Sequence, residues 1–432
     1  MGDRARGGGA PASDPRDAIE AVWRIESARL IAGLARMTRD VGVAEDLAQD
    51  ALLAALEQWP VSGVPENPGA WLMTTAKRRA IDGMRRAKML DRKHGELGAE
   101  LEERQDAAPD YAAALDDQVG DDLLSLIFTA CHPVLATEAR VALTLRLLGG
   151  LSTDEIARAF LVPKATIAQR IVRAKRTLAA ARVPFETPRG PELAARLTSV
   201  LNVIYLVFNE GYSATAGDEW VRPALCEDAL RLGRILAELM PAEPEVLGLV
   251  ALMEIQASRL QARRGPSGEP MLLFDQDRGR WDRLHIRRGL DAMARAKSTG
   301  GVLGPFMLQA AIAACHAEAR TAEETDWTRI TALYDALAQL TPSPVVELNR
   351  GVAYGMAYGP AAGLEIVDAL RAEPQLEQYH LLPSVRGDLL AKLGRFEEAR
   401  AEFARAADIT ANTRERTLLL GRAEACAQGR AQ

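Results

Sequence analysis

The segment LSTDEIARAFLVPKATIAQRIVRAKRTL, residues 151–178, carries the most informative pattern in this chain. Thr153 can cap a first helix, predicted over 153–160, because its side chain can accept a hydrogen bond from the first-turn amides. Pro163 disfavours the α conformation at Val162, so we expect the first helix to end in a short turn. The segment therefore predicts two helices separated by a tight turn.

The second of these helices, predicted over 164–182, is amphipathic. Its apolar face consists of Ile167, Ile171, Ala174 and Leu178. Its other face carries Lys164, Thr166, Gln169, Arg170, Arg173 and Arg176. This arrangement is typical of a helix-turn-helix, whose second helix lies in the major groove, where Gln and Arg contact bases and Lys or Arg hold phosphates. The alternative is a solvated basic helix in a bundle, and the cap, the turn and the acid-free face favour the helix-turn-helix.

The net charge of −6 averages over segments of very different charge. Residues 77–93 contain eight basic and two acidic residues, and residues 156–182 contain seven basic residues and no acidic one. Between them, residues 95–122 contain ten acidic residues and one arginine. Like charges at this density repel and extend a chain, so we expect an acidic linker over 94–121. The acidic total therefore does not exclude a nucleic-acid partner.

Helical periodicity runs through almost every informative segment, so the expected fold class is all-α. A length of 432 residues is enough for two to four domains. The predicted N-terminal helices span 18–37, 43–58, 67–89, 122–130, 136–148, 153–160 and 164–182. Pro184, Pro188 and Pro191 mark the start of a long helical C-terminal half.

The second and third predicted helices have one apolar face each. On the helix 43–58 the apolar stripe consists of Val43, Leu47, Ala51, Leu52, Ala55 and Leu56. Asp46, Gln49 and Asp50 lie off this stripe. Asn67 is a predicted N-cap for the next helix, with Pro68 at its first position. That helix is expected to turn inward the side chains of Trp71, Leu72, Thr75 and Ile81.

Three ordered segments together resemble the bacterial extracytoplasmic-function sigma factors of the sigma-70 family. AEDLAQDALLAALEQW (44–59) resembles the helix with which the family binds RNA polymerase core. GAWLMTTAKRRAIDGMRR (69–86) resembles the segment that reads the −10 promoter element, and 151–178 resembles the −35 reader. The resemblance implies a region 2 domain over 18–93 and a region 4 domain over 122–185. The charged, Gly/Pro-rich residues 1–17 are expected to form a disordered tail.

The resemblance also implies roles for individual residues. Asp46, Gln49 and Asp50 would contact the β′ clamp of core polymerase. The β flap of core is a further expected contact. The melted −10 strand would be bound by Lys77, Arg78, Arg79, Arg85 and Arg86. The −35 duplex would be read by Lys164, Thr166, Gln169, Arg170, Arg173 and Arg176.

The remaining residues, 190–432, exceed what such a factor needs. AKLGRFEEARAEFARAAD (391–408) has the spacing of a tetratricopeptide second helix, and weaker echoes precede it within 310–410. This resembles a subgroup of the family with a C-terminal extension of tetratricopeptide-like repeats. Arrays of paired helices bind peptides or proteins. The resemblance implies a protein or peptide partner and regulation in cis, in place of a separate anti-sigma factor.

Other functional classes find less support in the sequence. No catalytic constellation, metal-ligand spacing or cofactor motif occurs, so we expect no enzyme, metal or cofactor. The polar clusters at 209–212 and 275–282 are also explained by turns, caps and buried salt bridges. We expect a cytoplasmic protein without a membrane partner. Two alternatives remain: a helix-turn-helix regulator with a ligand- or peptide-sensing half that never binds polymerase, and an enzyme fused to a DNA-binding domain.

Overall fold

The computed structural model describes residues 15–94, 111–300 and 303–429, apart from the side chains at 15, 83–94 and 111–119. Most of the predicted tail (1–17) and much of the predicted linker (94–121) therefore lie outside the described residues. Within them the chain forms eighteen α-helices and two strands of two residues each, which confirms the all-α fold. The chain divides into two compact units, and each is described by itself.

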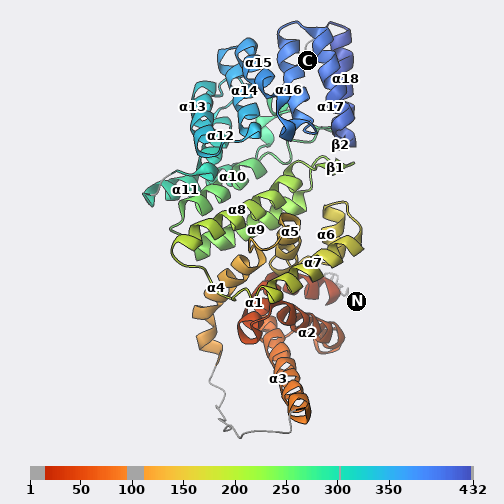
Figure 1. Ribbon diagram of the computed structural model, residues 1–432, viewed down its shortest axis with the longest axis vertical. Coiled ribbons are helices and arrows are strands. Elements are labelled where there is room, and N and C mark those ends of the chain that lie inside the picture. Colours follow the sequence, from red (N-terminus) through yellow and green to blue (C-terminus); the bar gives the residue numbers. More distant parts are fainter. Residues whose placement is uncertain (1–14, 95–110, 301–302, 430–432) are drawn as a thin grey trace, which may run out of the picture. The chain divides into compact units, whose positions relative to one another are not determined.

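The first unit comprises residues 1–158 and 162–203. It contains helices only, among the residues described (Figure 1). These are α1 (Pro15–Thr38), α2 (Val41–Ser62), α3 (Pro68–His94), α4 (Tyr111–Ala130), α5 (Thr137–Leu147), α6 (Thr153–Ala159), α7 (Lys164–Ala180) and the first half of α8 (Pro191–Tyr212). Helix α4 thus begins inside the segment that the charge pattern assigns to the linker.

Helix α2 packs on α1, and most of its buried side chains are alanines. Its buried positions include Val41, Ala44, Ala48, Ala51, Ala55 and Trp59. The predicted stripe was partly wrong, because Val43 and Leu56 are exposed. Alanines at a helical period allow the helix axes to approach closely. The alanine face is therefore buried, and the face with the larger apolar residues is left exposed. The outer face of α2 consequently carries exposed apolar side chains.

The third helix shows a similar shift. Asn67 caps it as predicted, since its Oδ1 accepts a hydrogen bond from the amide of Ala70 at 3.0 Å. Leu72 is buried as predicted, but Ile81 is 43% exposed, and Ala76 and Ala80 take the inward positions. Small residues again decide which side of the helix lies against the neighbours.

The N-cap of α6 differs from the prediction. Ser152, not Thr153, caps this helix: its Oγ accepts from the amide of Glu155 at 3.2 Å, and Glu155 accepts from the amide of Ser152 at 2.8 Å. This reciprocal pair is a capping box, which satisfies two amides at once and therefore places the cap one residue earlier. It also holds the Glu155 carboxylate, whose pKa is lowered by these bonds and by Arg24 against the opposing effect of its burial, which is the largest influence.

The first unit extends to residue 203, beyond the prolines that suggested a boundary near 190. Arg196 in α8 donates to the carbonyl of Phe128 at 2.9 Å, and Ser199 donates to the carbonyl of Cys131 at 2.8 Å. Both side chains are buried. The first half of α8 therefore completes the packing of α4, which Pro and Gly punctuation alone does not reveal.

The second unit comprises residues 159–161 and 204–432. Its α-helices are the second half of α8, α9 (Pro223–Leu239), α10 (Pro244–Ala257), α11 (Arg283–Ser298), α12 (Pro305–Glu318), α13 (Trp327–Leu340), α14 (Pro344–Tyr358), α15 (Pro360–Ala369), α16 (Leu381–Lys392), α17 (Phe396–Ile409) and α18 (Thr413–Ala427). Its short elements are β1 (Ala216–Gly217), β2 (Ala411–Asn412), and the 3-10 turns η1 (Leu273–Asp275), η2 (Arg278–Arg280), η3 (Leu370–Ala372) and η4 (Pro374–Leu376).

From α12 to α18 consecutive helices pack against each other along the chain (Figure 1). In the hairpin of α16 and α17, Gly394 makes the turn at φ +74°, and Ala399, Phe403 and Ala406 are buried. These are the positions that suggested a repeat. The tetratricopeptide assignment of the hairpins stays a prediction.

Helix α8 is the one helix in the described part of the chain that is long and apolar enough to cross a membrane by length and composition. Half of its apolar window is buried inside the structure. Such burial is typical of a core helix.

Asn412 connects the last helical hairpin to the loop after α8. Strand β2 pairs in parallel with β1, and Asn412 is fully buried at this contact. Its Nδ2 donates to the carbonyls of Ala214 at 3.1 Å and Glu219 at 2.8 Å, while its Oδ1 accepts from two amides and caps α18. One side chain therefore satisfies four backbone groups from segments almost 200 residues apart.

We expect Asn412→Ala to lower the free energy of unfolding of the C-terminal unit by about 2–3 kcal/mol, because it removes a cap and leaves two carbonyls without donors. Urea denaturation followed by circular dichroism measures this loss. The matched control is Ser343→Ala, which removes only the N-cap of α14 and should cost at most about 1 kcal/mol. Equal losses in the two variants would contradict a tethering role for Asn412.

Candidate promoter and polymerase interface

Helix α7 buries its apolar face and presents its polar face. Ile167, Ile171, Ala174 and Leu178 are all buried. The exposed polar side chains are those of Lys164, Gln169, Arg173 and Arg176, whereas Thr166 and Arg170 are half-buried. All six residues predicted to read DNA therefore lie on one helix, outside its four buried apolar positions.

The start of this polar face carries one ion pair. Lys164 Nζ lies 2.7 Å from a carboxylate oxygen of Asp154, and more than half of each side chain is exposed. An exposed pair of this kind contributes little to stability. Lys164 can therefore exchange its carboxylate partner for a phosphate at small cost.

The basic residues of α3 differ in their surroundings. Arg78 is exposed, while Lys77 is half-buried and its pKa is lowered by burial and by Arg36. Arg79 donates to the carbonyl of Asp50 and lies 3.7 Å from its carboxylate. Arg85 lies on the same helix, as does Arg86, but their side chains are outside those described. The two neighbouring arginines thus differ: Arg79 contacts α2, whereas Arg78 faces outward.

The outer face of α2 combines acidic and apolar side chains. The side chains of Asp46 and Asp50 are 81% and 54% exposed, and Gln49 is half-buried. Val43 and Leu53 are 47% and 56% exposed on the same side of the helix. Val43 was expected on the buried stripe and is exposed instead, and Leu53 was not among the predicted surface residues, although its spacing from Asp46 and Asp50 places it on their side of the helix. An exposed apolar strip bordered by charge is typical of a protein-binding surface.

Glu45, which the sequence analysis did not single out, is the centre of a buried ion cluster in the first unit. Its carboxylate accepts from Arg146 Nε at 2.5 Å and lies 2.6 Å from Lys175 Nζ, and its side chain is 4% exposed. Lys175 also lies 3.4 Å from Asp46. These contacts join α2 to α5 and α7. Lys175, a basic residue of α7 outside the set predicted to read DNA, therefore holds the helices together.

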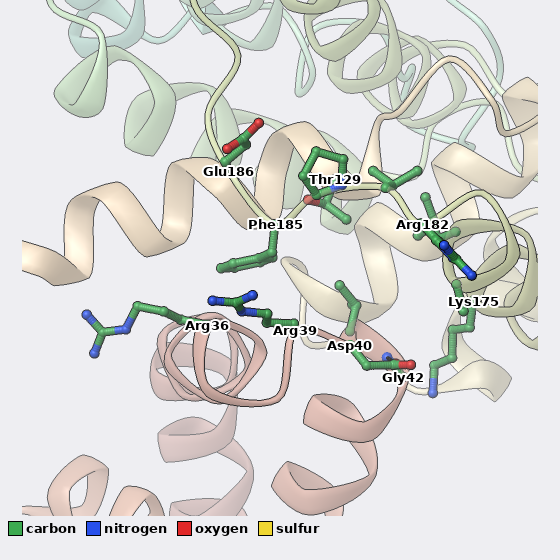
Figure 2. A pocket seen from close by; sticks show the side chains of 14 residues that line it. Arg36, Arg39, Asp40, Gly42, Thr129, Lys175, Arg182, Phe185 and Glu186 are labelled. Atoms are coloured by element: carbon green, nitrogen blue, oxygen red, sulfur yellow. Dashed lines mark hydrogen bonds between the residues drawn. The ribbon is translucent and has the colours of Figure 1, made fainter.

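A cavity of about 640 Å³ lies beside this cluster. Figure 2 shows the side chains that line it. They include four basic residues, Arg36, Arg39, Lys175 and Arg182, two acidic ones, Asp40 and Glu186, and Phe185, which extends from the segment after α7 toward α1. Two turns form its edges, since Arg39 and Arg182 have φ values of +54° and +48°.

The four cysteines are free and buried. Burial raises the pKa of the Cys131 thiol to about 11 and that of Cys226 to about 12, so both are neutral thiols at neutral pH. Neutral buried thiols pack as small apolar groups.

Family comparisons match three parts of the chain. Residues 25–89 match sigma-70 region 2, and residues 125–178 match sigma-70 region 4. Residues 196–297 match a family of unknown function, DUF6596. The two sigma regions coincide with the helices that carry the α2, α3 and α7 surfaces described above.

Several proteins are similar in sequence. An uncharacterized protein of Rhizobium meliloti is 44% identical over 384 residues, which cover 88% of this chain and 89% of that protein. A probable ECF RNA polymerase sigma factor of Mycobacterium tuberculosis, SigI, is 28% identical over 39% of this chain and 56% of its own length. The ECF RNA polymerase sigma factor SigK of Mycobacterium ulcerans is 28% identical over 38% of this chain and 84% of its own length.

No solved structure matches the chain. The matches to regions 2 and 4, in that order, and the similarity to two ECF factors agree with the surfaces on α2, α3 and α7. This chain therefore belongs to the extracytoplasmic-function sigma factors of the sigma-70 family, and its C-terminal extension is a separate helical domain.

Proposed function

We propose that the protein binds core RNA polymerase in the cytoplasm and directs initiation at specific promoters, and that its C-terminal unit regulates this activity in cis. The observation that carries the proposal is the pairing of two surfaces in one unit. Helix α7 presents an acid-free polar face, and α2 presents an acidic and apolar face. The first suits a DNA duplex and the second suits a protein with a basic, partly apolar surface.

The α2 surface would dock on the coiled coil of the polymerase β′ clamp. Asp46, Gln49 and Asp50 would supply specificity and raise the association rate, because rim charges act mainly in this way. Leu53 and Val43 would supply the apolar contact area. Region 4 would add a second contact, to the β flap.

Promoter reading is assigned to α7 and α3. The N-terminal half of α7, with Thr166, Gln169 and Arg170, would face base edges of the −35 element, and Lys164, Arg173 and Arg176 would hold phosphates. On α3, Arg78 would contact the melted −10 strand with Lys77, Arg79, Arg85 and Arg86. Single-stranded DNA is bound through such basic surfaces.

Regulation in cis is supported by where residues 159–161 pack. These residues begin the turn of the helix-turn-helix, yet they cluster with the second unit. Within that unit Arg222 donates to the carbonyl of Ala159 and pairs with Glu210, and both side chains are about nine-tenths buried. The chain continues from this turn into α7 within a few residues. Holding the turn would therefore restrict the orientation of the DNA-reading helix.

The central test is transcription in vitro with purified core polymerase. The full-length protein should co-purify with core and support transcription that core alone does not. Binding to duplex DNA without this activity would contradict the sigma proposal and would identify a helix-turn-helix regulator.

Substitutions on α7 should separate base reading from phosphate binding. Gln169→Ala should reduce discrimination between the cognate and a mutated −35 element by about 1–3 kcal/mol. Arg176→Ala should weaken binding to both and lower the slope of log K against log salt by about 0.9. Anisotropy titrations of the holoenzyme at several salt concentrations measure both. Arg283→Ala, an exposed arginine in the second unit, is the control, and an equal effect from it would contradict the assignment.

Substitutions on α2 should weaken docking without unfolding the protein. Leu53→Ser should lower the affinity for core about tenfold, about 1.4 kcal/mol, while the melting temperature is unchanged because the side chain is already 56% exposed. Asp46→Ala should mainly slow association. Gln58→Ala, which is exposed on another side of α2, is the matched control. Surface plasmon resonance with immobilised core gives both rates, and unchanged rates for Leu53→Ser would refute this docking face.

Regulation in cis is tested with Arg222→Gln in the full-length chain beside a truncation after residue 203. The truncation point keeps Arg196 and Ser199, which pack in the first unit. Both variants should change transcript yield per bound core polymerase, because the turn is released in each. Unaltered yield in both variants, with core affinity intact, would reject the regulatory role and leave the sigma assignment standing.

A further inference from the structure

A buried arginine without an acidic partner lies in the C-terminal unit. Arg259, directly after α10, is 7% exposed. Throughout the described residues no carboxylate lies within ion-pair distance of it, and its Nε has no hydrogen-bond partner. Aromatic rings surround it instead: the guanidinium carbon lies 5.6 Å from the ring centre of Trp281 and 5.7 Å from that of Tyr212.

Two further arginines approach the same rings. The guanidinium carbon of Arg263 lies 3.9 Å from the ring centre of Tyr212, and that of Arg278 lies 4.8 Å from the ring centre of Trp281. Arg263 Nε also lacks a hydrogen-bond partner among the described groups. We call Arg259, Arg263, Arg278, Tyr212 and Trp281 the arginine–aromatic cluster.

Negative charge near the cluster is confined, among the described residues, to Glu323 and Glu324, which act on Arg278 from a distance and not on Arg259. Arg278 is held by neutral groups, the carbonyls of His316 and Ala319 and the hydroxyl of Thr325. Burial, together with Arg259 and Arg278, lowers the pKa of His316 to about 3, so this histidine is neutral at neutral pH. Burial raises the pKa of Tyr205, which therefore stays protonated as well. The three guanidinium groups outnumber these two carboxylates, so the cluster keeps an excess of positive charge at a largely buried site.

Unpartnered polar atoms gather in the same place. Besides the two arginine Nε atoms, Gln256 Oε1, Trp281 Nε1 and His316 Nδ1 are buried without a hydrogen-bond partner in the described structure. Native proteins contain few such atoms, and each calls for a partner such as an ordered water or a bound ion. The border of the cluster is open, because Tyr212, Gln256 and Arg263 are only half-buried. The cluster is therefore in contact with solvent on this side.

We propose that the arginine–aromatic cluster binds a small organic oxyanion, a carboxylate or a phosphate. Guanidinium groups hold such oxyanions through paired N–H donors, and aromatic faces accept a planar group beside them. Burial of guanidinium groups without a carboxylate is costly, and a bound anion removes that cost. The cluster lies within residues 196–297, which match the family of unknown function. The proposal goes beyond sigma activity, because binding does not depend on transcription.

The test is calorimetry and thermal unfolding of the full-length protein with three probes: benzoate, benzamide and inorganic phosphate. Benzamide matches benzoate in shape and lacks its charge. Benzoate, phosphate or both should bind and raise the melting temperature, and benzamide should do neither. Binding of benzoate alone assigns a carboxylate ligand, and binding of phosphate alone assigns a phosphate ligand.

Substitutions then locate the site. Arg259→Met should reduce the affinity at least tenfold, and without anion it should not lower the melting temperature, because it removes an uncompensated buried charge. Arg263→Gln, at a half-buried position, tests the site even if Arg259→Met does not fold. Arg371→Gln, an exposed arginine in η3, should bind as the parent protein does.

Three outcomes overturn the proposal. The first is that neither anion binds up to about 10 mM, a concentration above the millimolar dissociation constants of weak ligands. The second is equal binding of benzoate and benzamide. The third is an unchanged anion affinity in Arg263→Gln. Any of them would leave the cluster as a purely structural set of cation–π contacts.

Discussion

The promoter-binding unit depends on one buried carboxylate. The Glu45 carboxylate in α2 contacts Arg146 from α5 and Lys175 from α7, so a single side chain joins a helix of region 2 to two helices of region 4. A buried charge must be paired, and removing one partner of such a cluster is strongly destabilising. The ion pairs of Glu45 therefore hold α2 and α7 in one position relative to each other inside this unit.

This constraint divides the basic residues of α7 into two groups. Lys175 is used internally, whereas Lys164, Arg173 and Arg176 stay on the exposed side. A similar division occurs on α3, where Arg79 binds α2 and Arg78 does not. Basic composition alone thus overstates the surface available to DNA. Leaving the carboxylates of Glu45 and Asp50 without a cation nearby costs free energy. This cost decides which arginines and lysines remain available to bind DNA.

In the C-terminal unit the buried arginines have two kinds of partner. Some of its arginines are paired in the usual way, as in the bond of Arg386 with Glu402 at 2.9 Å. Arg259 and Arg263 instead face aromatic rings. The chain contains enough acidic residues to pair them, so the absence of a carboxylate near them in the described structure is a local property of the site. The arginine–aromatic cluster therefore differs from the paired arginines of the same unit in both its packing and its charge.

The sequence by itself determined the all-α class, the helix-turn-helix with its buried Ile167 and Leu178, and the Asn67 cap, because these follow from periodicity and local hydrogen bonding. Tertiary structure decided which face of α2 is buried, since alanines allow close packing that larger residues at 43 and 56 do not. It also decided the partners of Glu45 and Arg259. The contacts of Glu45 join residues far apart in the chain. The surroundings of Arg259 depend on which side chains pack against it and on the lack of a carboxylate within ion-pair distance in the described structure. No local sequence pattern encodes either property.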